Sequence, residues 1–274
     1  MNQAQQRIAV VTGGGSGIGR GTAKVLAQAG DFVVVADVSA LNGLKVVEEI
    51  RAAGGTAAFR LVDVADVPAV DSLAKSVLAD FGTADILVNS AGILQNVSPI
   101  ETTPIEEHDR VMNINYRGAY LCCRAFAPQM MAQRKGNIIN ITSTAALHSM
   151  PTLAYGPSKA ALQMLTQNLA VDLGPLNVRV NAVMPGYVLT EQVQMRIDAG
   201  HRDPRSLSLH SALGRMVMPE DVGNAILFLC SDAASAITGI SLPVDCGYLP
   251  AVSYLHHPAL RGTHPRREDQ APVA

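Results

Sequence analysis

The residues with the clearest chemical potential are Tyr155 and Lys159, four positions apart in the run Tyr-Gly-Pro-Ser-Lys. Side chains at this spacing share one face of a helix. A free phenol has a pKa of about 10, too high for an efficient base near neutral pH. An ammonium about 4 Å away is worth roughly 4 kcal/mol at an effective dielectric near 20, or about 3 pKa units. We therefore expect Lys159 to lower the pKa of Tyr155, which then exchanges a proton with a substrate oxygen. By itself the pair is a common surface pattern, so other motifs must support it.

A glycine-rich turn near the start of the chain indicates a nucleotide site. Residues 12–19 read Thr-Gly-Gly-Gly-Ser-Gly-Ile-Gly, between an apolar run and an amphipathic helical pattern. Glycine lets the backbone turn sharply and approach a pyrophosphate, whose charge is met by amide groups at a helix N-terminus. The spacing G-x-x-x-G-x-G differs from the general G-x-G-x-x-G fingerprint, and a simple tight connection is the alternative. We interpret the turn as a dinucleotide site.

Asp37 ends the second apolar run, 18 residues after Gly19. A carboxylate at this place can accept hydrogen bonds from the adenosine ribose hydroxyls. The extra 2′-phosphate of NADP would meet like charge there, so NAD is favoured over NADP. A helix N-cap or turn role is the alternative for Asp37.

Seven short apolar runs alternate with longer helical patterns and predict an α/β fold. The expected strands are residues 7–11, 32–37, 57–62, 86–89, 137–142, 178–183 and 240–244. Parallel strands need crossover helices, so we expect one parallel sheet covered by helices on both faces. Residues 1–247 are predicted to be one domain, in which the polar, irregular stretch at about 188–213 covers the substrate. Residues 248–274 are predicted to be a C-terminal extension.

The composition excludes several classes of function. The chain has 274 residues, 48% hydrophobic and 16% charged, with a formal net charge of -2. A large core is available, and a basic surface for nucleic acid or anionic membrane is not expected. The four cysteines show no metal or redox spacing, and we expect no metal site. Reduced thiols and the lack of a signal or membrane-spanning pattern predict a cytoplasmic protein.

Further motifs stand in a fixed order along the chain: Asn89-Ser-Ala-Gly92, Asn115, Ser143 and Pro185-Gly186. Together with the glycine turn and the Tyr/Lys pair, they resemble the short-chain dehydrogenase/reductase family in its single-domain form, over about residues 7–247. The resemblance implies a Rossmann-type, doubly wound, seven-stranded sheet, a nicotinamide cofactor and a homotetramer or dimer. It also implies a catalytic tetrad of Asn115, Ser143, Tyr155 and Lys159.

The same resemblance implies which residues contact the cofactor. Lys159 would hold its ribose, Asp63 would lie near adenine, and Thr190 near the carboxamide. The full expected set is Gly13, Ser16, Gly17, Ile18, Gly19, Asp37, Asp63, Val64, Asn89, Ala91, Gly92, Tyr155, Lys159, Pro185, Gly186, Val188 and Thr190.

The chain departs from the family pattern at a few positions. Ser143 stands 12 residues before Tyr155, one fewer than usual, and Thr142 would restore the usual separation. We favour Ser143 as the hydroxyl that binds the substrate oxygen, because residues 140–143 align better as a block. The missing residue then falls within residues 148–152, on the substrate side. Cys246 stands where glycine is usual, so a left-handed backbone there would cost more.

These motifs predict an NAD-dependent oxidoreductase that moves a hydride between the cofactor and a small secondary alcohol or ketone, with Tyr155 as general acid and base. One alternative is an NADP-linked ketoreductase of biosynthesis. Another is a dinucleotide-binding regulator without turnover, which would need the glycine turn and Asp37 but not the tetrad.

Overall fold

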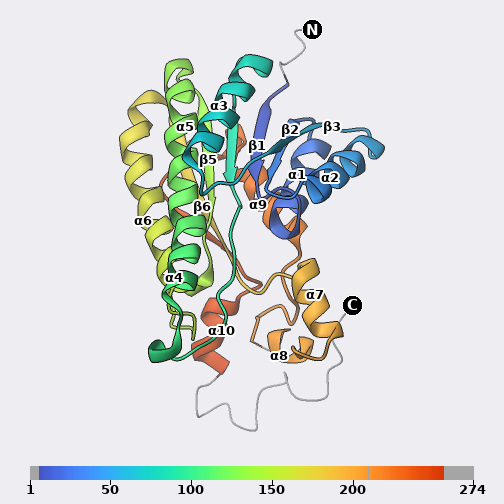
Figure 1. Ribbon diagram of the computed structural model, residues 1–274, viewed down its shortest axis with the longest axis vertical. Helices are drawn as coiled ribbons and strands as arrows, with labels where there is room; N and C mark the ends of the chain where they lie inside the picture. Colours follow the sequence, from blue (N-terminus) through green and yellow to red (C-terminus); the bar gives the residue numbers. More distant parts are fainter. Residues whose placement is uncertain (1–5, 209, 256–274) are drawn as a thin grey trace.

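The computed structural model describes residues 6–208 and 210–255, and its centre is a parallel sheet (Figure 1). The seven strands lie in the order β3-β2-β1-β4-β5-β6-β7. They are β1 (Ile8–Thr12), β2 (Phe32–Asp37), β3 (Thr56–Leu61), β4 (Ile86–Asn89), β5 (Gly136–Ile141), β6 (Val178–Pro185) and β7 (Ser241–Val244). This confirms the predicted doubly wound, Rossmann-type α/β sheet. The order reverses direction between β1 and β4, so a crevice for ligands is expected at the carboxyl ends of these strands.

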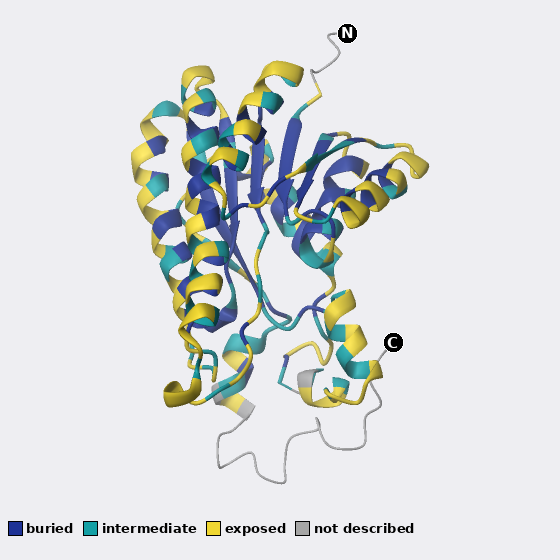
Figure 2. Ribbon diagram, viewed as in Figure 1, coloured by how far each residue is buried: buried dark blue, intermediate teal, exposed yellow. Residues whose placement is uncertain are grey.

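The central strands are buried on both faces, as a covered parallel sheet requires. All five residues of β1 are buried, and alternate side chains enter different cores. Val10 packs in one hydrophobic cluster, whereas Ala9 and Val11 pack in the other. Figure 2 shows this buried sheet between two layers of helices with exposed outer faces.

The helices divide into two layers and a group at one end of the sheet. One face is covered by α1 (Gly17–Gln28), α2 (Ala40–Ala52) and α9 (Pro219–Leu229), and the other by α3 (Val67–Phe81), α5 (Ala119–Gln133) and α6 (Tyr155–Leu173). Beyond the carboxyl ends of the strands lie α4 (Ile105–Met112), α7 (Glu191–Asp198), α8 (Pro204–Ser208) and α10 (Tyr248–Leu255) (Figure 1). Within the described residues, no helix is long and apolar enough to cross a membrane.

The predicted irregular segment after Pro185 is more ordered than its composition indicates. The hydroxyl of Thr190 accepts a hydrogen bond from the Val193 amide and caps α7, and the Asp203 carboxylate accepts one from the Arg205 amide at the start of α8. Side-chain capping of this kind lets a polar segment form short helices. The segment expected to cover the substrate therefore carries two helices.

The predicted C-terminal extension begins with a helix, and its residues 256–274 lie outside the described residues. The ring of Tyr248, the first residue of α10, lies 5.4 Å from the His148 ring and 5.3 Å from the Tyr187 ring. The start of the extension thus packs on loops at the carboxyl end of the sheet.

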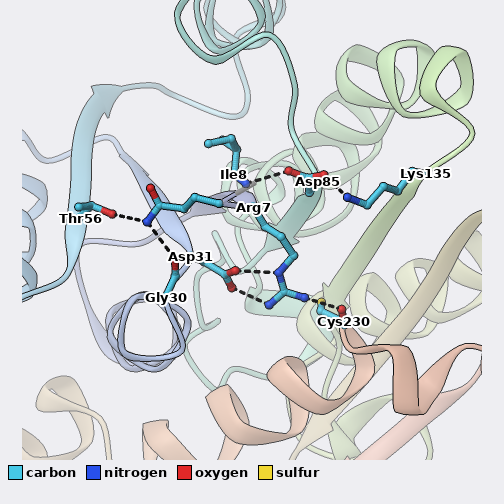
Figure 3. Close-up of polar contacts among 9 residues, drawn as sticks. Arg7, Ile8, Gly30, Asp31, Thr56, Asp85, Lys135 and Cys230 are labelled. Atoms are coloured by element: carbon cyan, nitrogen blue, oxygen red, sulfur yellow. Dashed lines mark hydrogen bonds and ion pairs between the residues drawn. The ribbon is translucent and has the colours of Figure 1, made fainter. Parts of the chain in front are cut away.

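Polar clamps hold the opposite end, where the strands begin (Figure 3). Arg7 makes a bidentate ion pair with Asp31 at 2.7 and 2.9 Å and also donates to the Cys230 carbonyl. Asp85 accepts from the Ile8 amide at 2.9 Å. These contacts tie β1 to the segments before β2, before β4 and after α9. These contacts hold the amino ends of the strands together, at the end of the sheet opposite the expected ligand crevice.

Candidate active site

Tyr155 and Lys159 lie on one face of α6, which begins at Tyr155. The Lys159 Nζ atom is 5.7 Å from the centre of the Tyr155 ring and donates a hydrogen bond of 2.8 Å to the Ile141 carbonyl at the end of β5. Lys159 is only 5% exposed. The two side chains therefore share one helix face, as their spacing predicts. The Ile141 carbonyl at the end of β5 holds the Lys159 ammonium in place.

The electrostatics of this pair differ from the expectation. Burial raises the pKa of Tyr155 above its usual 10.0, and a hydrogen bond with Ser143 opposes that rise only in part. Burial also lowers the pKa of Lys159 to about 8. The expected lowering of the Tyr155 pKa by Lys159 is therefore wrong for the chain alone. Desolvation of the phenolate is the larger effect here, and helix spacing reflects only the attraction between the two charges.

Ser143 and Thr142 make different hydrogen bonds in the structure. Ser143 follows β5 directly, accepts from the Ala145 amide at 3.2 Å and hydrogen-bonds to Tyr155. The Thr142 hydroxyl instead donates to the Val183 carbonyl on β6 at 3.0 Å, and the residue is 2% exposed. Only the Ser143 hydroxyl faces the phenol, which supports Ser143 over Thr142.

Asn115 lies in a π-helical turn, Asn113–Gly118, between α4 and α5. Its side chain forms two hydrogen bonds with the Ile93 backbone, accepting from N–H at 2.8 Å and donating to C=O at 3.0 Å. A Cβ atom at Gly92 would lie 3.3 Å from Asn115 Oδ1 and 3.5 Å from Lys159 Nζ. The loop after β4, the π turn and α6 thus meet around Gly92. π turns recur at functional sites.

The glycine turn is built for close approach. Gly13 and Gly17 have positive φ angles of 64° and 49°. A Cβ at Gly13 would lie 2.7 Å from the Ala91 Cα, and one at Gly19 would lie 2.0 Å from the Gly13 carbonyl oxygen. Side chains at these positions would separate the turn from the loop after β4 and from α1. The turn therefore has the shape that a pyrophosphate at a helix N-terminus requires.

Asp37 is fixed next to this turn. Its carboxylate accepts hydrogen bonds from the Gly15 amide at 2.9 Å and the Ser39 amide at 2.8 Å, and the residue is 9% exposed. The N-cap of α2 is Ser39, so the N-cap alternative for Asp37 is wrong, whereas the hydrogen bond from the Ser39 amide two residues later is that of a turn residue. A carboxylate has about four acceptor positions, so two amides leave capacity for ribose hydroxyls.

Glu191 is an unexpected anion at the same turn. Its carboxylate accepts from the Gly17 amide at 2.9 Å and from Arg20 at 2.6 Å. Arg20 also binds Glu49 at 2.9 Å, so its guanidinium is paired with two carboxylates. Nothing in the local sequence indicated Glu191, because its partners lie 171 and 174 positions earlier.

The remaining predicted cofactor residues are spread around the carboxyl end of the sheet. Ser16 is the exposed N-cap of α1, and Ile18 follows in its first turn. Asp63 is exposed beyond β3, whereas Val64 is buried in the core. Pro185 is the last residue of β6, and Gly186 follows it.

Two residues beyond β6 approach the glycine turn. Val188 forms a bridge with Val217, and the Thr190 Cγ2 atom would lie 3.2 Å from a Cβ at Gly17. The segment that carries Glu191 is therefore seated against the start of α1.

Asn89 does not turn its side chain toward the crevice. Its Nδ2 donates to Asn140 Oδ1 on β5 at 2.8 Å and lies 3.3 Å from the Cys123 sulfur. Its Oδ1 atom is buried and has no hydrogen-bond partner among the described residues. Cys246 has a positive φ of 52°, the left-handed conformation in which the sequence predicted a strain cost.

Gln95 is a second residue that the sequence did not single out. Its Oε1 accepts from the Ala154 amide at 2.7 Å and the Tyr155 amide at 3.2 Å, at the start of α6. No group of three His, Cys, Asp or Glu side chains that could hold a metal ion occurs within residues 6–208 and 210–255.

The chain is similar to known proteins in both sequence and fold. The family model described as enoyl-(acyl carrier protein) reductase, a short-chain dehydrogenase/reductase model, matches residues 13–249. Cyclopentanol dehydrogenase from Comamonas sp. (strain NCIMB 9872) is 39% identical over 249 residues, which are 90% of this chain and 99% of the relative.

Two solved structures are similar in both fold and sequence. NAD+-bound xylitol dehydrogenase shares 31% identity with a TM-score of 0.81, covering 87% of this chain and 97% of its own. ElxO with NADP bound shares 28% identity with a TM-score of 0.86, covering 90% of this chain and 100% of its own. The chain belongs to the short-chain dehydrogenase/reductase family, whose members bind a nicotinamide dinucleotide.

Proposed function

We propose that this chain is an NAD-dependent dehydrogenase that oxidises a secondary alcohol to a ketone and catalyses the reverse reduction. The observation that carries the proposal is the meeting of Tyr155, Ser143 and Lys159 at the carboxyl end of β5, on the same edge of the sheet as the glycine turn. The cyclopentanol dehydrogenase relative supports a secondary alcohol as the substrate class.

The residues present fit a dinucleotide. The turn allows close backbone approach, the α1 N-terminus offers amide groups, and Asp37 keeps free acceptor positions for a ribose. When bound, NAD accepts or supplies the hydride at its nicotinamide ring. We assign NAD over NADP because a 2′-phosphate beside the buried Asp37 carboxylate would be repelled.

The side chains then have separate tasks. Tyr155 takes the proton from the substrate hydroxyl in oxidation and returns it to the carbonyl oxygen in reduction. Ser143 donates a hydrogen bond to the same oxygen as charge develops on it. Lys159 holds positive charge near the phenol, and Asn115 fixes the loop that borders Lys159.

The roles of Tyr155 and Asp37 can be tested separately. Replacing Tyr155 by Phe should lower kcat on cyclopentanol by about 10²- to 10⁴-fold, the usual contribution of general acid–base catalysis, with little change in the NADH dissociation constant. Tyr120→Phe, at an exposed position on α5, is the matched control. If Tyr155→Phe kept most of the activity, the proton role would be wrong. Tighter binding of NADPH than NADH would refute the role of Asp37.

We also propose a homotetramer. Exposed apolar side chains on separate elements support it: Met164 and Val171 on α6, Phe228 on α9, and Ile240 directly before β7. Dihedral tetramers need two distinct self-complementary surfaces. Light scattering should give four times the chain mass, and Val171→Glu should reduce it to a smaller species.

A cytoplasmic location is part of the proposal, since all four cysteines are free thiols, as a reducing compartment requires. Residues 188–213 are proposed as the substrate lid, and the boundary of the catalytic domain at residue 247 stays a prediction.

A further inference from the structure

Gln95 connects the loop after β4 to the first residue of the catalytic helix. It is 7% exposed, and its carbonyl oxygen accepts from both the Ala154 and Tyr155 amides. The first amide groups of a helix have no partner within the helix and need an outside acceptor. Ala154, the N-cap of α6, has no side-chain acceptor. Gln95 therefore supplies the missing cap and positions Tyr155.

The other end of the same amide has no partner. Gln95 Nε2 is buried, yet no hydrogen-bond acceptor contacts it. Leaving a buried donor unpaired costs about 1–3 kcal/mol, so such groups call for an explanation. Because Gln95 Oε1 is bonded to the Tyr155 amide, the unpaired donor lies beside the residue proposed to react with substrate.

Two more unpaired polar atoms lie on the segment that leads into Tyr155. Within residues 6–208 and 210–255, nine buried side-chain atoms lack a partner, and His148 Nε2 and Thr152 Oγ1 are among them with Gln95 Nε2. The Thr152 carbonyl accepts from the Gly156 amide in the first turn of α6. Three of the nine thus belong to the two loops that meet at the start of the catalytic helix. Buried polar groups without partners are thus concentrated at the start of α6, where an incoming polar group could complete their hydrogen bonds.

The same loops also carry exposed apolar side chains. Leu94 precedes Gln95 and is 42% exposed, while Leu147 and Leu153 flank the polar atoms and are 56% and 40% exposed. A ligand with both an apolar body and an additional oxygen would match both kinds of side chain.

We propose that Gln95 is a specificity-determining residue, whose Nε2 donates a hydrogen bond to a second oxygen on an alicyclic secondary alcohol. The inference rests on the proposed function, because it assumes that Tyr155 acts on the first oxygen. The substrate class is a ring that carries one reacting hydroxyl and one further hydroxyl or carbonyl.

A series of ring alcohols tests the inference on the intact enzyme. Cyclohexanol is compared with the 1,2-, 1,3- and 1,4-cyclohexanediols in wild type and in Gln95→Glu. Glutamate keeps an acceptor for the two amides but lacks the NH₂ donor. Asn96→Asp, an exposed neighbour, controls for the added negative charge. Rates are taken on the plateau of each pH profile, so that a shifted Tyr155 pKa does not alter the ratio.

In wild type we expect kcat/KM for at least one diol to exceed that for cyclohexanol by about 10-fold or more. Gln95→Glu should reduce this ratio to near one, mainly through KM, while Asn96→Asp should leave it unchanged. Equal kcat/KM for cyclohexanol and every diol in wild type would overturn the proposal, whatever the stability of the variant. Equal losses on all substrates in Gln95→Glu would leave Gln95 a cap only and overturn its role in specificity.

Failure of the proposed function would look different. In that case wild type would oxidise no secondary alcohol, whether ring or open-chain, with NAD+ or NADP+, even though it binds NADH. Turnover without a preference for any diol would refute only the specificity role of Gln95.

Discussion

Replacing Lys159 by Met should abolish turnover and yet stabilise the fold at neutral pH. The ammonium is 5% exposed, and burial lowers its pKa from 10.5 to about 8. A difference of roughly 2.5 units corresponds to about 3 kcal/mol at 1.36 kcal/mol per unit. Methionine removes this cost but leaves the Ile141 carbonyl without its donor, a loss of about 1 kcal/mol. The net gain in unfolding free energy at pH 7 is then about 2 kcal/mol.

The pH dependence is the distinctive part of this prediction. Below pH 8 Lys159 is protonated in both the folded and unfolded chains, so wild type carries the full cost of the buried charge. Between pH 8 and 10.5 the unfolded chain binds more protons than the folded chain, so the stability of wild type rises with pH. The advantage of Lys159→Met should therefore shrink through this window and reverse slightly above it.

Urea unfolding at pH 7, 9 and 10.5, followed by circular dichroism at fixed protein concentration, measures the effect. Lys75→Met, at an exposed position on α3, is the control, and its effect should not follow the same pH course. If Lys159→Met were less stable than wild type at pH 7, or if the difference were constant across the three pH values, the reasoning would fail.

Two further predictions concern charges outside the tetrad. Glu191→Gln should bind NADH about 2- to 5-fold tighter. The Glu191 carboxylate accepts from the Gly17 amide and so competes with the pyrophosphate for the positive end of α1. Glu220→Gln, at an exposed position on α9, is the control and should not change NADH binding. Isothermal titration checks this, and weaker binding by Glu191→Gln would contradict it. Arg7→Met should lower the unfolding free energy by about 2–3 kcal/mol, because it leaves the Asp31 carboxylate, whose side chain is 4% exposed, without its cationic partner. Urea unfolding checks it, and a loss below 0.5 kcal/mol would show that the pair is solvated.

The fold could be predicted from the sequence because burial repeats along each strand. Residues 32–37 form β2 and residues 86–89 form β4, as expected, since apolar runs of this length with β-branched residues suit a covered parallel sheet. The ends of other strands shifted: β6 continues to Pro185, because the chain keeps its pairing with β7 up to Val244. The hydrophobic pattern of one strand does not show how far its backbone pairs with a neighbouring strand.

The parts of the candidate site that consist of residues close together in the sequence could be predicted. The parts that depend on contacts between distant loops were missed. Tyr155 and Lys159 share a face because of helix geometry, and the glycine turn follows directly from β1. Glu191 and Gln95 were missed because their partners lie 174 and 60 positions away, respectively. Such contacts depend on how loops at one edge of the sheet meet in space, which spacing in the sequence does not encode.

The raised pKa of Tyr155 bears on the direction of the proposed reaction. The chain alone keeps the phenol protonated, which is the form needed to donate a proton to a ketone oxygen. Oxidation needs the phenolate, and within the described chain Ser143 is the hydrogen-bonding group that offsets the desolvation. Positive charge near the phenol favours the phenolate, so a bound oxidised nicotinamide and the Lys159 ammonium would both act against the desolvation of Tyr155.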